Sequence, residues 1–308
     1  MTCYLSEVKK KHGGLFATLG LPKTPRATPT MQTEITTIYV ICDDYLKTRN
    51  YCDDSQVSLT TAEVMTTALV SARFFKNCLE HAREFLKEMG YMPNMLSQSR
   101  LNRRLHALPE VLWLGLFSVL AQVHQQLADS LDYIVDSLPI AICDNYRIPR
   151  AHLYGSRRGA FRGYIASKKR YFFGLRAHML TTAQGCPVEL VLAAASEADI
   201  VVFKRMQLDL PEGATIYADK AYTDYVWEDL LNEDTDLSLV ALRKSNSKRP
   251  MDGCVRYICH HVRKRIETSF SQIADFFAKR IYAITEQGVE LKAFLAVLAF
   301  SFMCLQLS

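Results

Sequence analysis

The pattern of apolar residues changes near Leu131, and this change limits what the chain can fold into. Between residues 31 and 128, apolar side chains recur every three or four positions, which predicts three or four helices that end with the apolar segment 109–126. From Leu131 onward, short β-branched and aromatic segments alternate with helical ones. We therefore expect a helical N-terminal domain over 31–128 and an α/β domain of the α+β type, with a mixed sheet, over 129–308.

Local signals place the expected elements. In the first domain, Thr60 and Glu63 form a capping box for a helix to about residue 75, and helices over 78–89 and 97–106 follow. In the second domain we expect strands over 131–142, 171–182, 187–195, 214–218 and 237–242, and helices from 196, over 224–232, around Glu267 and over 293–307. Residues 1–30 are rich in Lys, Thr, Pro and Gly and lack a period, which predicts a disordered extension.

Three acidic residues stand in apolar surroundings. Asp136 interrupts an apolar, β-branched segment, Asp219 ends the segment Ala-Thr-Ile-Tyr-Ala, and Glu267 lies beside an apolar helix face. Burying an unpaired carboxylate costs on the order of several kcal/mol, so these groups need partners. A divalent cation shared by all three is the simplest partner.

Each acidic residue also has an ordinary interpretation. Asp136 alone fits a strand-end cap, Asp219 can pair with Lys220, and Glu267 can form a helix salt bridge with Arg263. Asp144 competes with Asp136, but it lies eight residues further on, beyond the usual reach of one strand. The joint occurrence of all three acidic residues in matching strand and helix contexts favours one shared site.

Basic residues flank this acidic set on both sides. The net charge is only +5, but no Asp or Glu occurs from residue 145 to 188, and a second basic segment, 243–265, leads into Glu267. A solvated basic loop is the alternative for either segment. Because two such segments converge on one acidic site, a polyanionic substrate is favoured. The predicted phosphate contacts within these segments are Arg157, Arg158, Lys168, Lys169, Arg243, Lys244 and Arg263.

The helix expected over 97–106 carries Arg100, Arg103 and Arg104 at positions i, i+3 and i+4, on one face. A helix, a turn and a basic helix are typical of a helix-turn-helix DNA-binding unit. The alternative is a solvated basic helix that packs through Leu101 and Leu105.

The cysteines indicate a reduced, cytoplasmic protein. The nine cysteines have no paired spacing, and no hydrophobic signal segment stands at the N-terminus. The cluster of Cys254, Cys259, His260 and His261 lacks the second half of a zinc motif, so we expect these residues to precede or pack on a helix. The apolar segment 293–307 is shorter than the ~20 residues that span a bilayer, which predicts a buried helix and no membrane association.

Three segments carry a resemblance to a known family. VDSLP, YADKAY and RKRIETSFSQI resemble the three catalytic blocks of bacterial insertion-sequence DDE transposases, and insertion-sequence family 982 most of all, over residues 31–308. The resemblance implies an RNase H-like catalytic domain, in which Asp136, Asp219 and Glu267 are catalytic and Arg263 is the basic residue four positions before the Glu. Related groups often have Tyr seven residues before the Glu and Lys seven after it, where this chain has His260 and Ala274.

The resemblance also implies an activity. The protein is expected to be a Mg²⁺-dependent transposase, with two ions that Mn²⁺ can replace, held by Asp136, Asp219 and Glu267 about 3.5–4 Å apart. It would bind double-stranded DNA at terminal inverted repeats as a homodimer, cleave the 3′ ends and join them to target DNA. Further DNA-backbone contacts are expected from Lys220, Tyr222, Arg243 and Lys244. The alternatives are a transposase-derived DNA-binding regulator without catalysis, and a metal-dependent nuclease.

Overall fold

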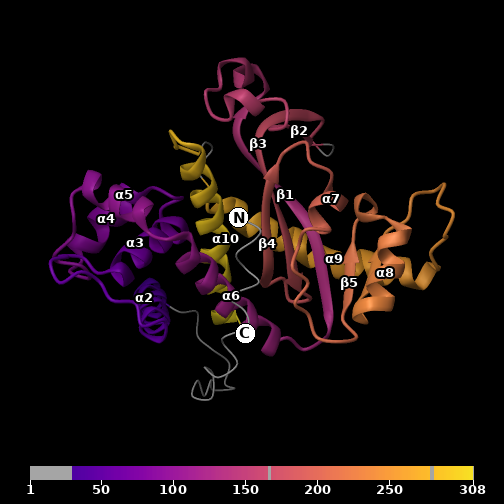
Figure 1. The fold of residues 1–308 in the computed structure, drawn as a ribbon, viewed down its shortest axis with the longest axis horizontal. Coiled ribbons are helices and arrows are strands. Elements are labelled where there is room, and N and C mark those ends of the chain that lie inside the picture. The colour runs from indigo at the N-terminus through magenta and orange to yellow at the C-terminus, as the bar shows by residue number, and fades with distance from the viewer. Residues whose placement is uncertain (1–29, 166–167, 278–280, 308) are drawn as a thin grey trace.

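A computed structural model describes residues 30–165, 168–277 and 281–307 (Figure 1). Almost all of the expected N-terminal extension, and residues 166–167, 278–280 and 308, lie outside the described residues. Thr30 caps the first described helix, because its Oγ1 accepts a hydrogen bond of 3.4 Å from the backbone N–H of Thr33.

The N-terminal part is helical, as the periodicity predicts. The described helices here are α2 (Met31–Thr48), α3 (Thr61–Phe74), α4 (Leu79–Glu88), α5 (Gln98–Ala107) and α6 (Glu110–Gln126). The capping box before α3 is confirmed: the backbone N–H of Thr60 donates to Glu63 Oε2 at 2.7 Å, and that of Glu63 donates to Thr60 Oγ1 at 3.2 Å. Most of α3 is buried, so it forms the centre of this helical group.

The second part contains the predicted mixed sheet. Its strands are β1 (Asp132–Asp144), β2 (Arg162–Ile165), β3 (Arg170–Thr182), β4 (Pro187–Ala194), β5 (Thr215–Ala218) and β6 (Ser238–Ala241). The order is β2-β3-β1-β5-β6, with β4 also paired to β3. β3 is antiparallel to β1, β2 and β4, whereas β1, β5 and β6 are parallel. The described connections include α7 (Asp199–Phe203), a 3-10 turn at Lys220–Tyr222, α8 (Tyr225–Thr235), α9 (Gly253–Asp275) and α10 (Glu286–Leu307).

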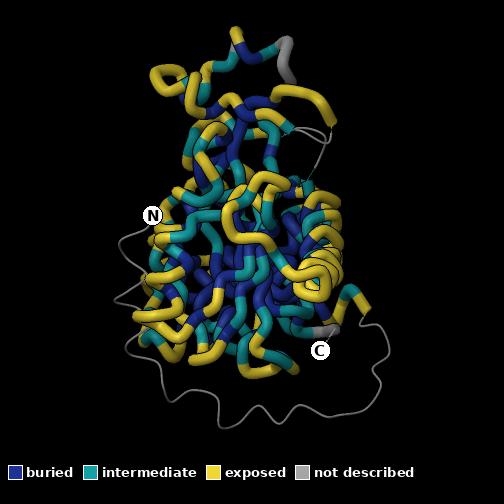
Figure 2. The backbone as a smooth tube through the Cα atoms, turned by 90° about the vertical axis from the view of Figure 1, so that its right-hand side faces the viewer, coloured by how far each residue is buried: buried dark blue, intermediate teal, exposed yellow. Residues whose placement is uncertain are grey.

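The two faces of the sheet pack on different partners. Side chains such as Tyr133 and Val135 join Phe203 of α7 and Leu231 of α8 in one apolar cluster. The opposite face packs on α9 and α10, and this core continues without a break into α3 and α6. Figure 2 shows the buried segments in the centre of the molecule, with exposed turns and helix faces around them. The domain boundary at 128/129 therefore remains a prediction.

α10 is a core helix, as the sequence predicts for residues 293–307. Within the described part of the chain it is the one single helix that is long and apolar enough to cross a membrane, but 72% of its apolar window is buried inside the protein. His124 of α6 fixes it further, since its Nε2 lies 2.9 Å from Ser301 Oγ. These contacts indicate that its apolar surface serves the core.

Candidate active site and its basic surroundings

The parallel pairing of β1 with β5 brings two of the predicted site residues together. The register aligns Val135 with Ala218, and this is the last pair before β5 ends. Asp136 follows Val135 in β1, and Asp219 follows Ala218 as the residue that precedes the 3-10 turn. The two carboxylates therefore lie on neighbouring strands at the same level of the sheet.

Helix α9 lies across the sheet and carries the third predicted residue. At one end the Cys259 Sγ lies 3.8 Å from the carbonyl oxygen of Ala218 in β5. Further along, Ser269 Oγ donates a hydrogen bond of 3.0 Å to the carbonyl oxygen of Gly185, in the turn between β3 and β4. Gly185 has a φ of +84°, and a side chain there would meet Ser269, so this close helix–turn contact requires glycine.

Arg263 of α9 connects the two aspartates. Its Nη2 donates a hydrogen bond of 2.8 Å to Asp136 Oδ2, and its Nη1 lies 3.6 Å from Asp219 Oδ1. The Arg263 side chain is only 11% exposed, so this is a largely desolvated pairing. Burial raises the pKa of the Asp136 carboxyl above its ordinary value, and the Arg263 guanidinium and the Ser137 backbone N–H oppose that rise.

Glu267 lies one helical turn beyond Arg263 on α9. Its side chain is exposed and makes no hydrogen bond or ion pair with any described residue. Among the residues that the structure describes, no three acidic, histidine or cysteine side chains are close enough to hold a metal ion. The structure thus brings together two of the three predicted ligands and places the third on the adjoining turn. The local alternative, an Arg263–Glu267 salt bridge, is not the pairing seen.

The Asp136–Asp219 pair nevertheless fits a hard divalent cation. Both carboxylates already surround one positive group, the Arg263 guanidinium. Carboxylate oxygens are the ligands that Mg²⁺ and Mn²⁺ prefer. The donor set is therefore suitable, and Glu267 is the nearest predicted group that can complete it.

A polar network lies on the other face of β1. Ser137 Oγ donates to Asp199 Oδ1 at 2.9 Å and accepts from Arg176 Nη1 at 3.2 Å. His178 Nδ1 lies 3.7 Å from Asp199 Oδ1, and burial lowers the pKa of His178 to about 3. Sequence reasoning missed the contacts among these four residues, because no short spacing links them. The alternation in β1 is the one available signal, since it turns Ser137 away from the face of its neighbour Asp136.

Tyr222 belongs to the same buried network, and its interpretation as a DNA-backbone contact is wrong. Only 1% of Tyr222 is exposed, and its hydroxyl lies 3.5 Å from His178 Nδ1. Burial raises its pKa well above the ordinary value. DNA cannot reach this side chain because the protein covers it on all sides.

The predicted basic residues divide into two groups. Six are exposed and make no ion pair with a described residue: Arg100, Arg103, Lys168, Lys169, Lys220 and Lys244. The others are engaged within the protein. Arg104 pairs with Asp53 at 3.1 Å, Arg157 pairs with Glu286 at 3.0 Å, Arg243 donates to Glu228 at 2.7 Å, and Arg158 donates to the carbonyl oxygens of Pro149 and Ala151. The first group is the one available to phosphates without breaking an existing contact.

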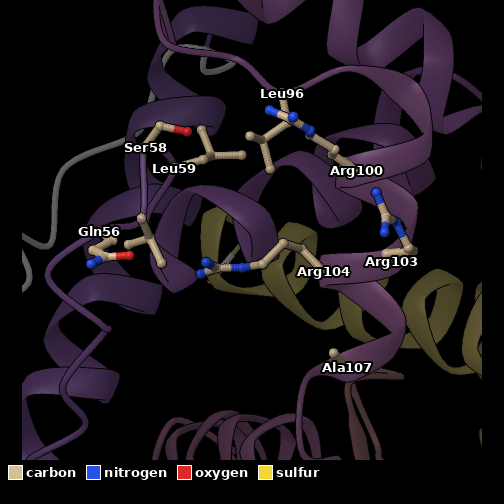
Figure 3. A pocket seen from close by; sticks show the side chains of 9 residues that line it. Gln56, Ser58, Leu59, Leu96, Arg100, Arg103, Arg104 and Ala107 are labelled. Atoms are coloured by element: carbon tan, nitrogen blue, oxygen red, sulfur yellow. The ribbon is translucent and has the colours of Figure 1, made fainter.

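The three arginines of α5 line an open hollow of about 460 Å³ (Figure 3). Arg104 reaches across it toward the segment that contains Gln56, whereas Arg100 and Arg103 lie on the solvent-facing part of the helix. The segment 89–97 separates α4 from α5, which is longer than the roughly 3–4 residues of a helix-turn-helix turn. The basic helix is therefore present, but its connection to α4 is longer than that of a typical helix-turn-helix unit.

Cys254, Cys259, His260 and His261 all lie on α9, as predicted. Cys259 is buried against β5 and β6, with its Sγ 3.7 Å from the carbonyl oxygen of Val240. Cys254 and both histidines are exposed. The residues before Glu267 thus form part of a long helix that packs on the sheet through Cys259.

The site thus combines a mixed sheet, two paired carboxylates and a helix that crosses the sheet above them. The family described as "Transposase DDE domain" matches residues 128–302, which is more than half of the chain. The chain belongs to this transposase family, whose members act on DNA and generally use divalent metal ions. No curated protein and no solved structure matches the chain.

Proposed function

We propose that this protein is a Mg²⁺-dependent insertion-sequence transposase of the family 982 type, with an RNase H-like catalytic domain. It binds terminal inverted repeats as a homodimer, cleaves the 3′ ends and joins them to target DNA. The observation that carries this proposal is the convergence of Asp136 and Asp219 on Arg263 beneath α9, in a chain of the DDE transposase family.

Asp136 and Asp219 would hold the metal, and Glu267 would complete the ligand set from α9. The bound metal would activate water or a 3′-OH and neutralise charge at the phosphorus. Arg263 keeps the two carboxylates together and offsets one of their two negative charges until a cation takes its place. Its guanidinium is then available to a DNA phosphate, which reconciles the predicted DNA contact with the ion pair.

The exposed cations would guide the DNA to this pair. Lys220 directly follows Asp219, and Lys244 lies in the segment that leads into α9. Arg100 and Arg103 on α5 would bind duplex DNA from the helical part of the protein. Arg104 would instead hold α5 in place through Asp53, so its contribution to DNA binding would be indirect.

A joining assay separates this function from the two alternatives. The DNA that flanks the gene supplies the inverted repeat, and a pre-nicked repeat end is incubated with plasmid and Mg²⁺. Joined product supports a transposase, and plasmid cleavage without joining supports a nuclease. A retarded band without either reaction supports a DNA-binding regulator. The pair of carboxylates favours an enzyme, because a regulator has no need for two acidic groups beside its DNA contacts.

A further inference from the structure

An exposed aromatic pair occupies the ribbon formed by β2 and β3. Tyr164 and Tyr171 are directly opposite each other, with ring centroids 5.0 Å apart and an interplanar angle of 53°. Both residues are 44% exposed, so much of each ring surface is open to solvent. Arg162 of β2 covers one side of Tyr171, with its guanidinium carbon 4.4 Å from the ring centroid. We call these three residues the tyrosine platform.

The platform lies on the same sheet face as Asp136. Asp136 is paired with Met179 of β3, and Tyr171 precedes Met179 by eight positions on the same strand. Since side chains alternate between faces, an even separation places Tyr171 and Met179 on one face. At about 3.3 Å per residue, the platform lies roughly 26 Å from the carboxylates.

The surroundings of the platform carry positive charge. Lys168 and Lys169, next to β3 at the same ribbon, are exposed and make no ion pair with a described residue. No acidic residue occurs anywhere from residue 145 to 188. A polyanion can therefore approach the platform without meeting a carboxylate from this part of the chain.

We propose that the tyrosine platform stacks an unpaired base of the DNA whose phosphodiester lies at the Asp136–Asp219 pair. The inference rests on the proposed function for the identity of the substrate as DNA. Every base has a π-face, and exposed aromatic rings beside cations bind single-stranded nucleic acid by stacking. With about 3.4 Å between successive base pairs, the span corresponds to about eight positions of duplex between the reacting phosphodiester and the stacked base.

A purely structural role is the competing explanation, because opposed aromatic residues stabilise an antiparallel ribbon. That role predicts a lower melting temperature after substitution and no effect that depends on an unpaired base. Stacking instead predicts an effect on DNA binding. The affinity for unpaired DNA should require the two aromatic rings, should not require their hydroxyl groups, and should exceed any effect on duplex DNA.

The test uses the full chain in EDTA, with fluorescein-labelled (dT)20 and a blunt 20-bp duplex as probes. The double variant Tyr164→Ala, Tyr171→Ala is expected to bind (dT)20 about 5- to 100-fold more weakly, with duplex affinity changed less than about twofold. The double Phe variant is expected to bind like the parent. Tyr39→Ala is the matched control, because Tyr39 is 37% exposed but lies on α2 in the helical part.

Two results would overturn the inference. If the Ala variant binds (dT)20 like the parent, the pair only stabilises the ribbon. If the Phe variant weakens as much as the Ala variant, the hydroxyl groups contact phosphate and no base is stacked. The joining assay tests the proposed function separately. If the parent joins no DNA but binds (dT)20 through the two tyrosines, the proposed function is rejected and the platform is supported. If the parent joins DNA but the Ala variant binds (dT)20 like the parent, only the platform is rejected.

Discussion

Arg263 donates a hydrogen bond of 2.8 Å to Asp136, and this contact joins helix α9 to the central strand β1. The same guanidinium lies 3.6 Å from Asp219, so one cationic side chain serves both predicted metal ligands. Because the guanidinium sits between the proposed metal ligands, a bound metal ion would compete with Arg263 for the same carboxylates. That competition makes Arg263 testable without any catalytic assay.

Replacing Arg263 with Gln is expected to lower the free energy of unfolding in EDTA by roughly 1–3 kcal/mol, because the largely buried Asp136 loses its charged partner. Mg²⁺ should then stabilise the variant more than the parent, since no guanidinium has to be displaced. Urea unfolding with and without Mg²⁺ measures both effects. Arg263→Lys keeps the charge but not the two-pronged geometry, so its stability and its response to Mg²⁺ should fall between those of the parent and the Gln variant. An equal Mg²⁺ effect in all three proteins would show that Arg263 does not compete with metal.

The substitutions Asp136→Asn, Asp219→Asn and Glu267→Gln are each expected to reduce cleavage and joining by at least about 100-fold. Each amide keeps the side-chain shape and removes one negative charge from the ligand set. Circular dichroism and DNA binding should stay close to the parent, which excludes misfolding as the cause. Glu267→Gln is the most informative, because Glu267 is exposed and has no described partner. A Glu267→Gln protein with parental joining activity would remove this residue from the proposed site.

Features that depend on neighbouring residues could be predicted from the sequence. The Thr60–Glu63 capping box forms within one helical turn, and the β3–β4 hairpin follows from two strand patterns around a short turn. β2 was missed because it has only four residues and contains Gly163, so it shows no alternation of its own. Its strand character comes from pairing with β3.

Features that depend on distant pairing could be predicted only through the family resemblance or not at all. The closeness of Asp136 and Asp219 requires the parallel register of β1 and β5, which no local pattern contains. The exposure of Tyr222 was predicted wrongly, because its burial depends on the other layers of the fold. The Arg263–Asp136 ion pair was missed because the sequence offers Arg263 a nearer partner, Glu267, one turn away.

The arginines of α5 are expected to differ although they share one helix. Arg100→Ala and Arg103→Ala should each weaken duplex binding and reduce the salt slope by about one, because each exposed guanidinium neutralises a phosphate. Arg104→Ala is the matched control. It should leave the salt slope unchanged and lower the free energy of unfolding by about 1 kcal/mol, because Arg104 is bonded to Asp53 and lies 3.4 Å from Thr61 Oγ1. Equal salt slopes in all three variants and the parent would return α5 to a packing role.

His124 should make the stability of the α6–α10 contact depend on pH. The side chain is buried and its Nε2 lies 2.9 Å from Ser301 Oγ; burial lowers its pKa from 6.5 to about 4. The unfolded chain therefore binds a proton at higher pH than the folded one, so stability falls as the pH drops from about 6.5 toward 4 and levels off below that. The full loss of stability from this residue is about 3 kcal/mol.

His178, with a pKa lowered to about 3, contributes in the same direction, so the difference between parent and variant is the diagnostic quantity. We expect His124→Gln to unfold with a shallower pH dependence than the parent between pH 4 and 6.5, measured by urea titration at each pH. Parallel curves for the two proteins would mean that His124 is protonated equally in the folded and unfolded states.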